Sequence, residues 1–145
     1  MVTLVDEVVR KLGGRPVLGA DVQSQADLAL AVQRRLPLRA LNGLAQTAGL
    51  TEQEIEQFVI PQRTRRHRAE KGQPLTVEES DRLVRLLRIE TLAAATFGES
   101  DKARHWLRRP LTELGHEAPL VMAQTEAGAR VIETILGKIA WGAAA

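Results

Sequence analysis

The chemically active side chains of this sequence are most concentrated in one segment, where cationic residues gather within eleven positions. Residues 61–71 hold five Lys or Arg and one Glu, a net charge of +4, whereas residues 1–60 and residues 72–145 each carry a net charge of −1. An Arg side chain can pair with phosphate oxygens, or with the O6/N7 edge of guanine, through two parallel hydrogen bonds. Localised basic charge is what a polyanionic partner requires, so this segment is a candidate nucleic-acid-binding element.

Helical spacing would divide this charge between two faces. Arg63, Arg66 and His67 lie three or four residues apart and share one face of a helix, whereas Arg65 and Arg68 lie on an adjacent face. A solvated basic face is the alternative interpretation, but only one acid stands among the five bases. The residues expected to bind DNA are Gln62, Arg63, Thr64, Arg65, Arg66 and Arg68.

The basic segment closely follows another expected helix, which is the layout of a helix-turn-helix. An earlier register is also open, because Ala45, Gly49 and Ile55 match the small, glycine and aliphatic positions of this motif. That register would make residues 52–58 the recognition helix. Those residues include three glutamates, which would repel phosphates. The sequence therefore favours the basic segment as the recognition helix.

The elements that position this segment follow from apolar spacing and end signals. Thr51 and Thr76 each open a capping box, with Glu54 and Glu79 three residues later. Other expected N-cap residues are Thr3, Ser24 and Thr125. The expected helices span residues 3–12, 24–36, 37–48, 51–59, 61–71, 76–97, 99–109 and 125–141, with single turns at 110–115 and 119–122.

A loop containing Pro16 and Gly19 is expected between the first two helices. No segment shows the period-two alternation of a half-buried strand. The sequence therefore predicts an all-α fold. The apolar content of 44% is enough for a packed core.

Several classes of site and location are not favoured by the sequence. The chain has no Cys, so it has neither disulfides nor a thiolate metal site. Its three His residues lack metal-ligand spacing, and the nucleophile, phosphate-loop and dinucleotide motifs are missing. We expect no enzyme activity, no cofactor and no bound metal. The acidic N-terminus and the lack of a long apolar run predict a cytoplasmic protein.

The C-terminal third resembles the toxin-binding domain of the Xre/MbcA/ParS antitoxins. The matching features are Phe97-Gly98, Ala103-x-x-Trp106-Leu107, Pro110, Leu114-Gly115, Pro119-Leu120, Thr125-Glu126-x-Gly128-x-x-Val131 and Ile139-Ala140-x-Gly142. Features similar to the DNA-binding half of the same family are Arg63-Thr64, Gly72, Leu75, Glu79-Ser80-Asp81-Arg82-Leu83 and Arg85-Leu86. The resemblance covers about residues 38–142.

This resemblance implies a bacterial type II antitoxin that is not itself an enzyme. Its partner would be a RES-domain toxin that consumes NAD or transfers ADP-ribose, and its last helix would lie at the mouth of the toxin's active site. The complex would also repress its own operon through the helix-turn-helix, and a homodimer would suit two DNA half-sites. The residues expected to bind the toxin are Arg130, Glu133, Lys138, Trp141, Gly142 and Ala143.

The resemblance also implies a domain order. An N-terminal helix-turn-helix bundle would be followed by a small helical toxin-binding domain. The expected boundaries are residues 1–37 for N-terminal helices of unassigned role, 38–97 for the DNA-binding domain and 98–145 for the toxin-binding domain. Two alternatives stay open, a stand-alone helix-turn-helix repressor and an oligomeric scaffold whose basic helix is only solvated.

Overall fold

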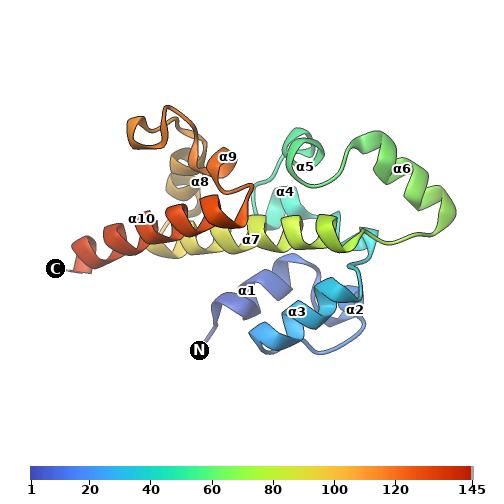
Figure 1. Cartoon of the computed structure of the whole chain (residues 1–145). Coiled ribbons are helices and arrows are strands. Elements are labelled where there is room, and N and C mark those ends of the chain that lie inside the picture. The colour runs from blue at the N-terminus through green and yellow to red at the C-terminus, as the bar shows by residue number, and fades with distance from the viewer. Residues whose placement is uncertain (145) are drawn as a thin grey trace. The chain divides into compact units, whose positions relative to one another are not determined.

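The computed structural model describes residues 1–144, and its regular structure is helical (Figure 1). Within these residues there is no β-strand, only an isolated antiparallel bridge between Leu111 and Glu117. The prediction of an all-α fold is confirmed. In chain order the elements are α1 (Leu4–Lys11), α2 (Gly14–Leu18), α3 (Gln25–Gln33), the 3-10 helix η1 (Leu38–Leu41), α4 (Leu44–Thr47), α5 (Glu52–Phe58), α6 (Gln62–Lys71), α7 (Val77–Phe97), α8 (Ser100–Arg108), the 3-10 helix η2 (Thr112–Leu114), α9 (Pro119–Met122) and α10 (Glu126–Ala144).

The chain forms two compact units that meet within the longest helix. The first unit runs from Met1 to Val84, and the second begins at Arg85. Helix α7 therefore contributes its first turns to one unit and the rest to the other. The boundaries expected at residues 37/38 and 97/98 stay predictions.

In the first unit, the start of α7 is tied to the segment that follows α3. The backbone N–H of Leu36 donates to the buried hydroxyl of Ser80 at 2.9 Å. Leu36 and Leu75 also share a backbone hydrogen bond of 2.9 Å. Large side chains that this unit buries fully are Leu12, Leu36, Leu41, Leu44, Leu50, Ile55, Ile60, Leu75 and Leu83. These contacts fix the beginning of α7 beside the helices that precede it.

In the second unit, α10 runs along the later turns of α7 (Figure 1). The buried apolar side chains come from α7, α8, η2, α9 and α10, and the residue that follows α9. They are Leu86, Leu87, Ile89, Ala93, Ala103, Leu107, Leu114, Leu120, Ala123, Ala129, Ile132 and Leu136. The backbone N–H of Gly128 donates to the Thr125 hydroxyl at 3.0 Å, so Thr125 caps α10 as predicted. A Cβ on Gly128 would overlap the carbonyl oxygen of Met122, so α9 and α10 approach too closely for any side chain there.

The other predicted N-cap residues are also confirmed. Thr3 and Thr51 form capping boxes with residues three positions later, and the Ser24 hydroxyl accepts the backbone N–H of Asp27. At Thr76 the hydroxyl accepts the N–H of Glu79, and the Glu79 carboxylate accepts the N–H of Thr76. The residues that cap the N-termini of these helices could therefore be predicted from the sequence.

Three local predictions were wrong. The loop expected around Pro16 contains the short helix α2, because a proline in the first turn lacks only an N–H that has no helical partner. The single helix expected over residues 37–48 is broken between η1 and α4, where Gly43 adopts a positive φ of 77°. The last helix continues past 141 to Ala144, so Gly142 lies within it.

Candidate functional site

All six residues expected to bind DNA lie on α6, and none of its residues is fully buried. The helix follows α5 after the three residues Val59–Pro61, which is the layout that the sequence predicted for a helix-turn-helix. Val59 and Ile60 are buried, and the Arg82 guanidinium donates to the Val59 carbonyl at 2.8 Å. The turn is thus anchored, while the helix that follows it stays at the surface.

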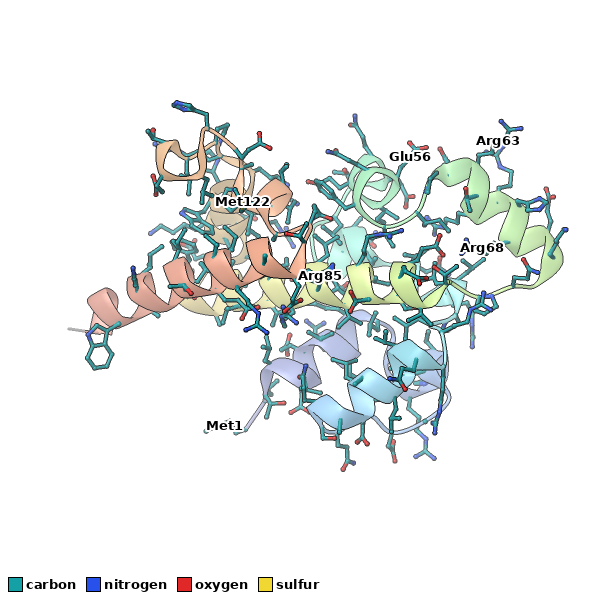
Figure 2. The ribbon with its side chains drawn as sticks, viewed as in Figure 1. Met1, Glu56, Arg63, Arg68, Arg85 and Met122 are labelled. Atoms are coloured by element: carbon teal, nitrogen blue, oxygen red, sulfur yellow. The ribbon has the colours of Figure 1, made fainter. Side chains whose placement is uncertain are left out.

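Arg68 faces inward from α6. Its guanidinium makes a two-point ion pair with Glu79 on α7, of which the Nη2–Oε2 hydrogen bond measures 2.9 Å. Only 15% of the Arg68 side chain and 8% of the Glu79 side chain are exposed. Figure 2 shows Arg68 directed toward α7 and Arg63 directed away from the protein. Arg68 is therefore committed to a contact inside the first unit.

Arg65 is held in a similar but more open way. It donates to the Glu52 carboxylate at 3.1 Å and to the Asn42 side chain at 3.4 Å. Glu52 is 72% exposed, so solvent and salt screen this pair. Arg65 thus links α6 to α5 more loosely than Arg68 links it to α7.

The remaining predicted DNA-binding residues are more accessible. Gln62, Arg63 and Arg66 are exposed, and Thr64 is half-buried. Within residues 1–144, the guanidinium groups of Arg63 and Arg66 have no protein hydrogen bond or ion pair. Arg66 also lines a shallow hollow of about 330 Å³ between α5 and α6. The structure therefore separates the basic helix into an inward pair of arginines and an outward pair.

The glutamates of α5, the recognition helix in the alternative register, have partners within the first unit. Glu52 pairs with Arg65, and Glu54 completes the capping box with Thr51. Glu56 accepts the backbone N–H of Gln62 at 3.2 Å, at the start of α6. These acids orient α5 and α6 relative to each other, and they leave α6 as the helix that offers cations to solvent.

Helix α10 presents an accessible face of mixed chemistry. Arg130, Lys138 and Trp141 are exposed, and 79% of Trp141 is accessible. They lie eight and eleven residues apart along the helix, a spacing that keeps them on one side. The side of α10 that packs into the second unit carries Ala129, Ile132 and Leu136. A tryptophan this accessible, beside two cations, is an unusual surface feature.

Glu133 lies apart from that face. Its carboxylate pairs with Arg88 on α7, with an N–O distance of 2.8 Å. Arg88 also approaches Glu126 at 3.5 Å, and Arg130 approaches the same acid at 3.8 Å. Gly142 is exposed within α10, and the Ala143 side chain lies outside the described residues. Of the six residues expected to bind a toxin, Glu133 is thus engaged inside the unit.

The aromatic residue of α8, Trp106, packs against another aromatic side chain of the protein. Trp106 is half-buried, and its ring centroid lies 5.5 Å from that of Phe97. His105 beside it is exposed.

Among the described residues there is no group of three or more His, Asp or Glu side chains placed to hold a metal ion. Within residues 1–144, no helix combines the length and the apolar character needed to cross a bilayer.

Two family models match the chain in the order of the two units. The antitoxin Xre-like helix-turn-helix domain matches residues 27–88. The antitoxin Xre/MbcA/ParS C-terminal toxin-binding domain matches residues 92–142. The chain belongs to the Xre/MbcA/ParS antitoxin family. Residues 1–26 precede both matches.

Curated relatives in this family share the same name. An antitoxin Xre of Pseudomonas putida is 42% identical over 99 residues, covering 68% of this chain and 62% of the relative. An antitoxin Xre of Photorhabdus laumondii is 38% identical over 68 residues, covering 46% of each chain. One of Yersinia enterocolitica is 33% identical over 84 residues, covering 57% of each chain. The matched region spans less than two thirds of each relative, and family membership rests on both models together with these relatives.

Sequence reasoning missed the partners that fix the surface arginines. It identified Glu79 as part of a capping box but not as the partner of Arg68. It also missed the pairing of Glu133 with Arg88. These pairs join residues eleven and forty-five positions apart. No local signal could have identified them, because each depends on how two helices pack.

Proposed function

We propose that this chain is the antitoxin of a type II toxin–antitoxin system and neutralises a RES-domain toxin by covering its active site. The family match over residues 92–142 supports a toxin as the partner. The resemblance of the sequence to the Xre/MbcA/ParS antitoxins supports a RES-type, NAD-consuming or ADP-ribosylating enzyme. The observation that carries the proposal is the exposed Trp141, which lies within the matched toxin-binding region.

The exposed face of α10 has the chemistry of an interface anchor. Trp and Arg are enriched among residues whose truncation most weakens protein complexes. Arg130 and Lys138 would meet acidic or polar groups at a cleft that otherwise receives the phosphates of NAD. Trp141 and Gly142 would enter the cleft, because the glycine keeps the last turns of the helix slim. Glu133 would contribute indirectly, by holding α10 against Arg88.

The test is co-purification of the full chain with the product of the adjacent gene, followed by measurement of NAD consumption. A complex in which NAD consumption is suppressed would support the proposal. Removal of residues 140–145 should leave the chain folded and weaken inhibition. Full inhibition by the shortened chain would show that the end of α10 does not cover the active site. No complex, with the neighbouring protein equally active alone and mixed, would refute the toxin-binding function.

We also infer that the chain represses its own operon through α6, acting as a homodimer in the cytoplasm. The match of residues 27–88 to a helix-turn-helix domain supports DNA as the partner. Gln62, Arg63, Thr64 and Arg66 would contact DNA directly. Arg65 and Arg68 would act by orienting the helix, since both are paired within the unit. A two-fold dimer would present two such helices to a pseudopalindromic site.

The DNA function is tested by titrating the chain into duplexes that cover the region upstream of its own gene. Affinity should fall steeply as salt rises, because binding releases counterions from phosphates. A chain that binds this DNA and has no toxin partner would be a stand-alone repressor. A chain that binds the toxin but no DNA at any salt concentration would refute autorepression alone.

A further inference from the structure

Two arginine ion pairs link helix α6 to the rest of the first unit. None of its residues is fully buried, and the side chains of Arg65 and Arg68 are only 23% and 15% exposed. Among the described residues, its side chains bind other segments through the ion pairs of Arg65 with Glu52 and of Arg68 with Glu79, and through the hydrogen bond of Arg65 to Asn42. The first is open to solvent at Glu52, whereas the second is largely shielded on both sides. The pair with Glu79 is therefore the stronger constraint on how α6 is turned.

Glu79 is itself rigidly placed. Its backbone N–H donates to the Thr76 hydroxyl at 3.1 Å, and its carboxylate accepts the Thr76 N–H at 2.8 Å. Both carboxylate oxygens also accept from Arg68. Burial by itself would raise the pKa of the Glu79 carboxyl, but the hydrogen bonds from Arg68 and Thr76 hold that pKa below its ordinary value. The carboxylate is thus charged, fixed at the start of α7, and aimed at α6.

We propose that Glu79 is a positioning residue for DNA recognition, because its two-point pair with Arg68 sets the rotation of α6 that turns Arg63 and Arg66 outward. The proposal rests on the DNA-binding function proposed above. A planar guanidinium that pairs with both oxygens of a carboxylate fixes direction as well as distance. An acid that never touches DNA would thereby be required for its recognition.

The test compares Glu79→Gln with Glu78→Gln in the full chain. Each change removes one negative charge from the first turn of α7, but Glu78 is exposed. The Glu79→Gln variant can keep the capping-box hydrogen bonds, since glutamine serves as well as glutamate at this position. Simple electrostatics predicts that loss of an acid tightens DNA binding for both variants. A positioning role predicts the opposite for Glu79→Gln alone.

The measurement is fluorescence anisotropy with overlapping duplexes from upstream of the gene and with a scrambled duplex of equal composition. We expect Glu79→Gln to lose about tenfold or more in affinity for the preferred upstream duplex, which is the discrimination carried by one good base contact. Its affinity for the scrambled duplex should not fall, because the charge of α6 is retained. Glu78→Gln should bind both duplexes at least as tightly as the unsubstituted chain.

Four outcomes would decide against the proposal or its basis. Equal or tighter binding of the upstream duplex by Glu79→Gln would overturn it, and so would equal losses on both duplexes. If Glu79→Gln fails to fold by circular dichroism, Arg68→Lys replaces it, since this variant keeps the charge but not the two-point geometry. Unchanged preference in Arg68→Lys would then overturn the proposal. If the unsubstituted chain prefers no upstream duplex, the DNA-binding function itself fails.

Discussion

Helices α6 and α10 both offer cations to solvent, but the protein holds them in different ways. Helix α10 is fixed by an apolar side, on which Ala129, Ile132 and Leu136 are completely buried. Helix α6 buries no residue fully and depends on two arginine ion pairs. Apolar packing has no charge for salt to screen or for pH to remove, whereas ion pairs respond to both. The orientation of α6 should therefore respond to salt and pH more strongly than that of α10, which keeps its buried apolar side even when its ion pair with Arg88 is weakened.

The largest expected effect tests the packing of α10. Gly128→Val would place a branched side chain where even a Cβ overlaps the Met122 carbonyl oxygen. We expect the second unit to lose about 3 kcal/mol or more of unfolding free energy, as for other severe core clashes. Urea denaturation followed by circular dichroism measures this loss. Gly137→Ala is the control, because nothing lies within 4 Å of its Cβ position, and it should not be destabilising.

The second-largest expected effect is a loss of toxin binding by α10 without a loss of stability. Trp141→Ala removes a side chain that is 79% exposed, so unfolding free energy should change by less than about 0.5 kcal/mol. Affinity for the toxin should fall by about 2 kcal/mol or more if Trp141 is an interface anchor. Calorimetric titration of the toxin measures the difference. Wild-type affinity in this variant would move the interface away from the end of α10.

The charge dependence of α6 gives a pH prediction. The pKa of Glu79 is lowered in the folded protein, because the hydrogen bonds from Arg68 and Thr76 outweigh the effect of burial. The resulting stabilisation is present above the ordinary carboxyl pKa of about 4.3 and is lost as pH falls through the lower folded-state pKa. Unfolding free energies of the unsubstituted chain and of Glu79→Gln should therefore differ at neutral pH and converge in acid. A difference that stays constant as the pH is lowered would contradict the assignment.

The smallest effect concerns the outward side of α6. Arg63→Gln should leave stability unchanged, because Arg63 is exposed and makes no hydrogen bond or ion pair among the described residues. The slope of log affinity for DNA against log salt should decrease by about 1, the loss of one phosphate contact. Binding measured at several salt concentrations gives this slope. Arg63→Lys, which keeps the charge, should retain it.

Much of the fold could be predicted because its signals are local. A capping residue and its partner lie three positions apart, so Thr51 and Thr76 predicted their helices directly. Amphipathic spacing likewise identified α7 and α10, and the scarcity of period-two patterns excluded strands. The errors occurred where local signals compete, as at Pro16 and Gly43. There, a residue that commonly ends a helix served instead to start one.

By itself, the sequence determined most of the helices, where the basic charge lies and which family the chain resembles. It placed five cations on one helix but could not say which of them face solvent. Only the tertiary structure assigned Arg65 and Arg68 to ion pairs and left Arg63 and Arg66 outward. The physical reason is the distance along the sequence over which each feature is decided. Helix spacing is fixed by the backbone within a few residues, whereas an ion pair between α6 and α7 depends on how the two helices pack.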